Sequence, residues 1–191
     1  MFVNWKQREL NVKIVYYGSA LSGKTTNLQY ICAHTKPHMR SDLVTLKTQG
    51  DRTLFFDYMQ LELGEIKGLK PRFSLYTVPG QPHYAATRKL VLRGVDGLVF
   101  VADSQRHCLA ENKRVLVELE RYLEAMGHRL DRVPLVLQCN KQDLASALPP
   151  EVLKDHLLGN GVPCIASVAT RGIGVPDTLR AIINELLRRL T

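Results

Sequence analysis

The chain lacks the features that would place it in a membrane or outside the cell. None of its apolar runs approaches the ~20 residues that a membrane-spanning helix requires. Residues 1–6 have neither the basic start nor the long apolar stretch of a signal peptide. Residues 186–191 contain no cysteine for prenylation, and Phe2 excludes N-myristoylation. These absences predict a cytoplasmic protein without a stable membrane anchor.

Cysteine is scarce as well. The four cysteines lie far apart in the 191 residues, and no two of them form a C-x-x-C pair. Metal sites and redox pairs built on cysteine usually need such spacing. We therefore expect reduced, mostly buried small side chains rather than metal ligands. They are Cys32, Cys108, Cys139 and Cys164.

Long runs of one charge are missing too, although the formal net charge is +8. An excess of positive charge can attract nucleic acid or an anionic membrane surface. However, the basic residues are spread among acidic ones, and clusters such as Arg88-Lys89 and Arg188-Arg189 are short. A solvated surface is the simplest interpretation and an acidic protein partner is the next. No nucleic-acid partner is predicted.

What the chain does contain is a regular alternation of strand and helix patterns. Apolar, β-branched or alternating runs predict strands, at residues 12–17, 43–46, 53–63, 72–78, 98–102, 134–139 and 163–168. Stretches with helical spacing or without Gly and Pro predict helices, at residues 24–34, 84–92, 109–126, 150–158 and 175–190. Residues 1–10 form a polar lead-in that we assign to an extra edge segment.

This order of elements predicts an α/β fold. Residues 53–63 and 72–78 flank a turn marked by Gly64 and Gly68, which indicates one antiparallel hairpin. Elsewhere strands alternate with helices, so we expect a mixed, mainly parallel sheet with helices on both faces. Because the chain contains no repeat and no linker, residues 1–191 are expected to form a single domain.

Residues 18–25 carry the strongest local motif, two glycines five apart followed by Lys and Thr. The motif lies between a predicted strand and a predicted helix, as a phosphate loop must. Its backbone N–H groups and the helix N-terminus would surround a phosphate. Lys24 would reach the β- and γ-phosphates, and Thr25 would ligate Mg²⁺. The predicted ligand-binding residues are Gly18, Ser19, Ala20, Leu21, Ser22, Gly23, Lys24, Thr25 and Thr26.

A second motif, Asn140-Lys141-Gln142-Asp143, directly follows an apolar strand. The Asp143 carboxylate can accept hydrogen bonds from N1–H and the 2-amino group of guanine, which adenine lacks. Asn140 would brace the loops, and the aliphatic stem of Lys141 would cover the base. Alone, the four residues are compatible with a plain turn. Two strand–helix units after a phosphate loop, they favour guanine over adenine.

Two further loops follow predicted strands, where ligands bind in sheets of this kind. Residues 168–170, Val168-Ala169-Thr170, would present a backbone N–H to the guanine O6. Gly80 would let a backbone N–H approach the γ-phosphate, and Gln81 would orient the attacking water. The alternative for residues 168–170 is a simple strand-end loop. The alternative for Gly80 and Gln81 is a Pro-Gly turn with an exposed glutamine.

Together these motifs, in this order and spacing, resemble the Ras-like small GTPases, and so predict the phosphate-loop NTPase small G-domain fold. Further runs narrow the resemblance to the bacterial MglA family of gliding-motility and cell-polarity GTPases. They are residues 13–18, 52–57, 75–81 and 92–97. The likeness covers roughly residues 5–190, nearly the whole chain.

The resemblance implies slow, Mg²⁺-dependent hydrolysis of GTP and switching between two conformations. It implies that Arg52 is an intrinsic arginine finger, which neutralises charge on the γ-phosphate. Lys24, Gln81 and Arg52 would then be the catalytic residues. Thr53 matches the switch threonine that contacts Mg²⁺ or the γ-phosphate. The implied partner is a roadblock-fold, MglB-like activating protein that docks on residues 47–60 and 80–92, where Phe55, Phe56 and Tyr58 lie.

The sequence departs from the Ras-like pattern at two positions that bear on chemistry. Thr77 stands where Ras-like proteins usually have an Asp that helps to hold Mg²⁺, a feature shared by the MglA group, and Asp57 is the candidate substitute. Ala20 stands where the family generally has Gly, so its methyl group would crowd Gln81 and slow hydrolysis. A GTP-hydrolysing switch is therefore the leading hypothesis. A GTP-binding interaction module with little turnover is the alternative, and an ATP-dependent kinase or transport ATPase is disfavoured by residues 140–143.

Overall fold

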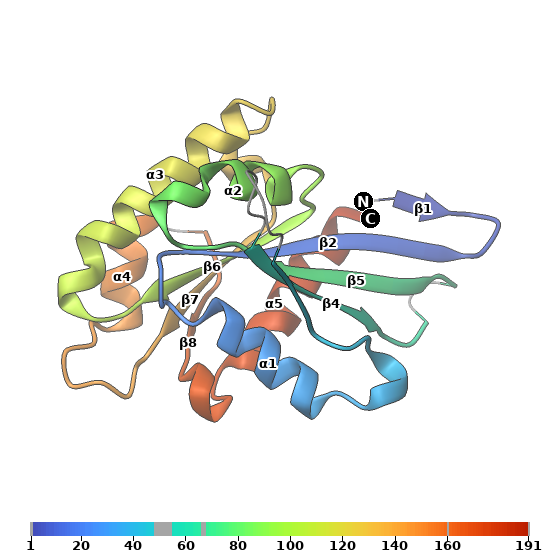
Figure 1. Cartoon of the computed structure of the whole chain (residues 1–191), viewed down its shortest axis with the longest axis horizontal. Coiled ribbons are helices and arrows are strands. Elements are labelled where there is room, and N and C mark those ends of the chain that lie inside the picture. The colour runs from blue at the N-terminus through green and yellow to red at the C-terminus, as the bar shows by residue number, and fades with distance from the viewer. Residues whose placement is uncertain (1, 48–54, 66–67, 160, 191) are drawn as a thin grey trace.

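A mixed sheet of eight strands runs through the centre of the computed structural model, which describes residues 2–47, 55–65, 68–159 and 161–190 (Figure 1). The strands are β1 (Phe2–Asn4), β2 (Glu9–Tyr17), β3 (Val44–Lys47), β4 (Phe55–Glu62), β5 (Lys70–Thr77), β6 (Gly97–Asp103), β7 (Leu135–Asn140) and β8 (Cys164–Ala166). The order across the sheet is β3-β4-β5-β2-β6-β7-β8, and β1 pairs with β2 beside this path.

The pairing confirms the predicted hairpin and the mixed sheet. β4 and β5 are antiparallel, while β2 runs parallel to both β5 and β6, and β7 runs parallel to β6 and β8. Two more antiparallel pairs, β1 with β2 and β3 with β4, exceed the single one expected. β1 has only three residues. Such a strand is too short to show a period, so the sequence indicated an edge segment without its pairing.

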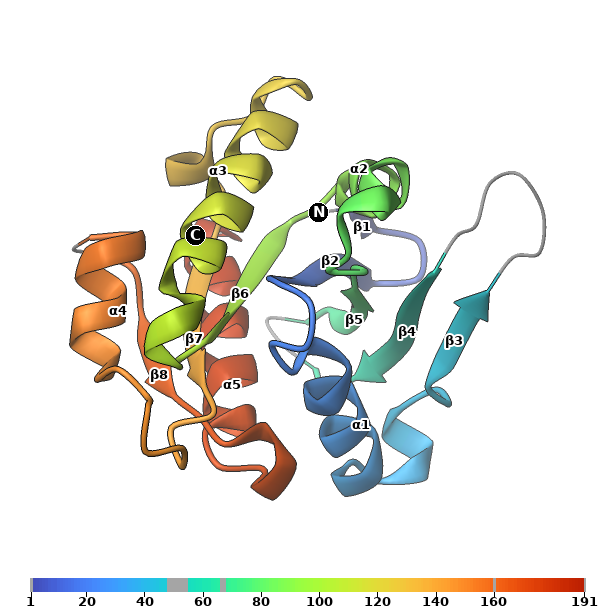
Figure 2. The same ribbon diagram turned by 60° about the vertical axis from the view of Figure 1, so that its left-hand side comes forward.

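Helices cover both faces of the sheet, as predicted. They are α1 (Lys24–His34), α2 (Ala85–Leu92), α3 (Leu109–Glu124), α4 (Pro150–Leu157) and α5 (Val175–Leu187). Figures 1 and 2 show α1 and α5 on one face and α2, α3 and α4 on the other. Each face has its own apolar core, one including Leu28 and Ile182 and the other Leu92, Leu119 and Leu153. Because both faces are covered, every residue of β6 and β7 is buried.

The observed helix bounds agree closely with those predicted from the sequence. α1 spans the predicted residues. α3 ends two residues early because Gly127, at a φ of 78°, turns the chain, and His128 donates its N–H to the Leu123 carbonyl. α5 gives way to a short 3-10 turn at Arg188–Leu190 rather than continuing to residue 190.

The cysteines are free, but they are less buried than predicted. Cys139 on the central strand β7 is buried, whereas Cys32, Cys108 and Cys164 are half-buried. Cys164 is more accessible because β8 is an edge strand. In the described part of the chain, no helix combines the length and apolar character needed to cross a membrane.

Candidate functional site

The phosphate loop, residues 18–23, connects the buried end of β2 to the start of α1. The N-cap Gly23 has a φ of 105°, and a Cβ atom there would overlap the side-chain amide of Asn140. Leu21 has a φ of 60°, which a non-glycine residue seldom adopts, and the residue is 89% exposed. The positive φ of Leu21 is backbone strain of the kind that clusters at ligand-binding loops.

Lys24 is the charged group at the centre of this loop. Its side chain is buried, and Nζ donates hydrogen bonds to the carbonyls of Gly18 at 3.0 Å and Ser19 at 2.5 Å. Burial, and then the positive charge of Arg88, lower the pKa of Lys24 to about 7, against the attraction of Asp57. An anion bound at the loop would supply the countercharge that these two carbonyls lack.

We predict that nucleotide binding takes up about 0.9 proton per site at pH 8. A lysine whose pKa is about 7 is mostly neutral at pH 8 in the free protein. Beside phosphates its pKa returns towards the ordinary value near 10.4, so the amine becomes charged on binding. Calorimetric titration with GDP in two buffers of different ionisation enthalpy measures the uptake. Lys24 should contribute only about 0.1 proton at pH 6, where the free amine is already mostly charged. Absence of uptake at pH 8 would contradict the prediction.

Asp57 is the centre of a compact group of side-chain oxygen atoms beside the phosphate loop. It is buried on β4, and its Oδ2 accepts hydrogen bonds from Thr25 Oγ1 at 2.6 Å and Thr77 Oγ1 at 2.8 Å. Its Oδ1 accepts one from Thr45 Oγ1 at 2.9 Å. The β4–β5 pairing brings Asp57 and Thr77 together. One carboxylate among hydroxyls at the helix start is a donor set that suits Mg²⁺, which prefers oxygen ligands.

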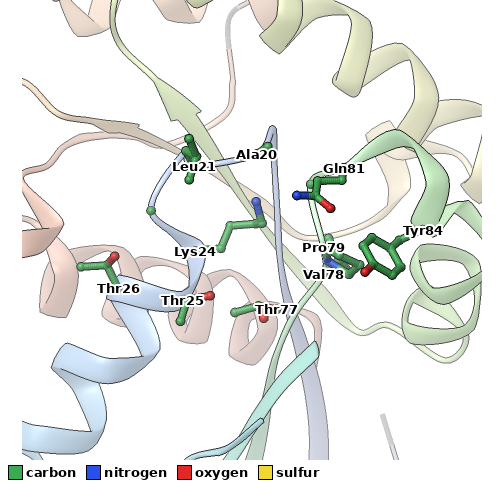
Figure 3. Close-up of a pocket in the computed structure, with 12 residues that line it drawn as sticks. Ala20, Leu21, Lys24, Thr25, Thr26, Thr77, Val78, Pro79, Gln81 and Tyr84 are labelled. Atoms are coloured by element: carbon green, nitrogen blue, oxygen red, sulfur yellow. The ribbon is translucent and has the colours of Figure 1, made fainter. Parts of the chain in front are cut away.

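The segment after β5 faces the phosphate loop across a cavity of about 460 Å³. Gly80 approaches so closely that a Cβ atom would overlap the backbone of Ala20. Gln81 is exposed, and Figure 3 shows it lying across the cavity from Lys24 and near Ala20. The residues that line this cavity are Ala20, Leu21, Gly23, Lys24, Thr25, Thr26, Thr77, Val78, Pro79, Gly80, Gln81 and Tyr84. Arg52 and Thr53, predicted to act here, lie outside the described residues.

A second cavity of about 280 Å³ adjoins the first and shares Leu21, Gly23 and Thr26 with it. The remaining residues of its lining come from two loops far apart in the sequence. They are Asn140, Lys141, Asp143, Leu144, Val168, Ala169 and Thr170. Both loops predicted to read a base thus lie around one cavity, next to the phosphate loop. Gly18, Ser19 and Ser22 belong to the phosphate loop but line neither cavity.

Asn140 joins the loops of the two cavities. Its side chain is buried, its Nδ2 donates to the Ser22 carbonyl at 2.7 Å, and its Oδ1 accepts from the Ala169 amide at 2.9 Å. Lys141 has a φ of 66°, and its Nζ lies 2.5 Å from Asp103 Oδ2. The bracing expected of Asn140 is therefore present, and Asp143, which is exposed, is free to face a ligand.

Asp103 and Tyr84 are site residues that the sequence analysis did not single out. Asp103, the last residue of β6, fixes Lys141. Burial alone would raise the pKa of Asp103, but hydrogen bonds from Lys141 and Gln105 outweigh burial and hold it below its ordinary value. A charged residue at the end of an apolar strand was the available signal. Tyr84 lines the larger cavity, and no local pattern marks it.

Comparisons with known proteins agree with this geometry. The family model of the ADP-ribosylation factor family matches residues 1–186. The mutual gliding-motility protein MglA of Myxococcus xanthus is 49% identical over 189 residues, which cover 99% of this chain and 97% of that protein. ADP-ribosylation factor-like protein 4C of human and of mouse is 27% identical over 186 residues, 94% of this chain and 88% of that protein. The chain therefore belongs to the Ras-like small GTPases, within the MglA family.

Proposed function

We propose that this protein is a molecular switch that binds GTP and hydrolyses it slowly with the help of Mg²⁺, and that residues 1–191 act as one G domain. The observation that carries the proposal is the pair of adjoining cavities. One is lined by the phosphate loop and the other by Asn140, Lys141 and Asp143, and they share three residues. A nucleoside triphosphate needs this arrangement, with anion ligands at one end and hydrogen-bond acceptors for a base at the other.

Each catalytic step falls to residues on these loops. Lys24 binds the β- and γ-phosphate oxygens, and Gln81 orients the attacking water. Arg52, carried over from the family resemblance, would neutralise charge on the γ-phosphate, and Thr53 would contact the metal. When bound, Mg²⁺ neutralises charge that develops on the phosphate oxygens. Thr25 and Asp57 are the described residues that would hold it, directly or through water.

The switch itself would be the segment around Gly80. Gly80 lies directly against the backbone of Ala20. A third phosphate on the bound nucleotide would therefore press on this segment. Its position would therefore depend on whether a third phosphate is present. Such a dependence on the nucleotide is how one surface can bind a partner in one state and release it in the other.

The partner is expected to dock beside this segment. The ring centroid of Tyr76 lies 4.8 Å from that of Tyr58 and 5.9 Å from that of Phe56, and all three residues are half-buried. Val44 and Leu46 on the edge strand β3 are 44% and 42% exposed. The side chain of Phe55 lies outside the described residues. An apolar surface of this kind suits a protein partner, and the family implies a roadblock-fold, MglB-like activator. We infer a role in motility from the name of the Myxococcus relative, and a role in cell polarity from the family resemblance.

The alternative function is a GTP-binding interaction module with little turnover. Ala20 favours it, because its methyl group lines the cavity near Gln81. Thr77 favours it less than the sequence suggested, since Asp57 supplies a carboxylate within hydrogen-bonding distance of Thr77. Phosphate release from GTP and from ATP under single-turnover conditions tests the proposal. Release from GTP alone is expected, and equal use of ATP would overturn it.

Replacing Ala20 by glycine is expected to accelerate this hydrolysis by about tenfold, since removing a steric misfit near the reacting groups restores their alignment. The affinity for GDP, which lacks the γ-phosphate, should change little. Single-turnover phosphate release and GDP titration of Ala20→Gly and wild type give both quantities. Ala125→Gly, at an exposed position at the end of α3 and outside both cavities, is the control for the substitution itself. An unchanged hydrolysis rate in Ala20→Gly would show that the methyl group is not the obstacle.

A further inference from the structure

Arg88 is a buried arginine whose bonds converge on the switch segment. It lies on α2 and is 3% exposed. Its Nη1 donates hydrogen bonds to the carbonyl of Gln81 at 2.6 Å and to that of Pro79 at 3.2 Å. These two carbonyls flank Gly80, the residue that approaches the phosphate loop. One guanidinium therefore fixes the backbone on both sides of Gly80.

The other end of Arg88 is anchored on α3. Its Nε lies 2.6 Å from Glu118 Oε1, and the Glu118 side chain is 20% exposed. The same carboxylate oxygen accepts a hydrogen bond from the Tyr17 hydroxyl at 3.2 Å. Tyr17 is the residue directly before the phosphate loop, at the end of β2. A continuous path of two hydrogen bonds and one ion pair thus leads from the strand that carries the loop, through α3, to the backbone of Gln81.

We propose that Arg88 is a positioning residue for hydrolysis, which holds the backbone of Gly80 and Gln81 in place against Glu118. This inference rests on the proposed function, in which Gln81 orients the attacking water. Because the side chain of Gln81 is exposed, its placement depends on the backbone that carries it. A rigid planar guanidinium, with several donors in a fork, can bond two carbonyls and a carboxylate at once, which the single ammonium of lysine does less well.

Glu118 also offers a matched control. Arg114 lies on the same helix, and its Nη1 is 3.5 Å from Glu118 Oε2. It therefore shares the carboxylate with Arg88. However, the Arg114 side chain is 47% exposed, and its hydrogen bonds lead to Glu111 and Glu118 on its own helix. A change at Arg114 perturbs the same ion-pair network without touching the backbone of Pro79 or Gln81.

The test measures single-turnover GTP hydrolysis by three single variants, Arg88→Lys, Arg114→Lys and Gln81→Ala. It also includes the double variant that combines Arg88→Lys with Gln81→Ala. Lysine keeps the positive charge next to Glu118, which limits the loss of stability. We expect Arg88→Lys to slow hydrolysis by about 10- to 100-fold, since misplacing a catalytic group by about 1 Å has effects of that size. GDP affinity should stay within about twofold, because GDP lacks the phosphate that this segment serves. Arg114→Lys should behave as wild type.

The combined variant separates positioning from general support of the fold. If Arg88 acts through Gln81, Arg88→Lys slows the Gln81→Ala protein no further. An equal slowing in both backgrounds, or a parallel loss of GDP affinity, would overturn the inference. If Arg88→Lys hydrolyses GTP at the wild-type rate while Gln81→Ala is slow, the inference about Arg88 is overturned and the proposed function is not. A wild-type rate in Gln81→Ala would remove the role proposed for Gln81 and this inference with it, whereas the absence of GTP hydrolysis in the wild-type protein would remove the proposed function. Should Arg88→Lys melt below the assay temperature, Glu118→Gln gives the same comparison from the other end.

Discussion

Asp143→Asn is expected to weaken GTP binding by about 10⁴-fold, the discrimination that mismatched polar groups at a binding site produce. The carboxylate accepts hydrogen bonds from N1–H and the 2-amino group of guanine, whereas the asparagine amide places a donor against a donor. Asp143 lines the smaller cavity and is exposed, so the change should leave the fold intact. Equilibrium titration with GTP, at fixed Mg²⁺, measures the loss.

The same substitution should transfer the preference to xanthosine triphosphate, which has a carbonyl where guanine has its 2-amino group. The asparagine N–H₂ donates to that carbonyl, so the hydrogen bonding is restored with the partners exchanged. Asp155→Asn is the matched control, because Asp155 is an exposed residue of α4 outside both cavities. If Asp143→Asn binds GTP as tightly as the wild type does, the assignment of the guanine site to the cavity lined by Asp143 is wrong.

Asp57→Asn is expected to lower the Mg²⁺ affinity of the GTP-bound protein by about 10- to 100-fold, which is the usual effect of losing a group that supports a metal. Asparagine keeps the size of the side chain and one acceptor oxygen for Thr25 and Thr77, but removes the negative charge. The rate of GTP release, measured over a series of free Mg²⁺ concentrations, reports the change. GTP binding without Mg²⁺ should be affected much less.

A second variant distinguishes a lost charge from a disturbed strand. Thr77 faces Asp57, and its Oγ1 is 2.8 Å from the carboxylate. Adding Thr77→Asp to Asp57→Asn returns a carboxylate to the same group of oxygens, on β5 instead of β4. The double variant should recover most of the Mg²⁺ dependence. Full dependence in Asp57→Asn alone would show that Asp57 takes no part in holding the cation.

The sequence predicted the parts of the fold that repeat locally. α1 begins and ends where its pattern does, and the β4–β5 hairpin is present, because periodicity and turn residues act over a few residues. β1, with three residues, shows no period, so its pairing with β2 had to come from the structure. The predicted hairpin is thus confirmed, whereas the two further antiparallel pairs, β1 with β2 and β3 with β4, were not predicted.

The candidate site divides in the same way. Residues 18–25 and 140–143 were found because each motif supplies its chemistry within a few positions. Asp57 was only a candidate, since its contact with Thr77 depends on how two strands pair across a hairpin. Arg88 was noticed only as part of a short basic cluster. Its burial and its bonds to the Gln81 carbonyl arise from the packing of α2 on α3, which no local pattern encodes.

The bonds of Asn140 also bear on how a ligand leaves. One side chain fastens the wall of the phosphate cavity, at Ser22, to the wall of the base cavity, at Ala169. The two ends of a bound nucleotide would therefore be held by one connected frame. Such a frame would make the spontaneous release of a bound nucleotide slow.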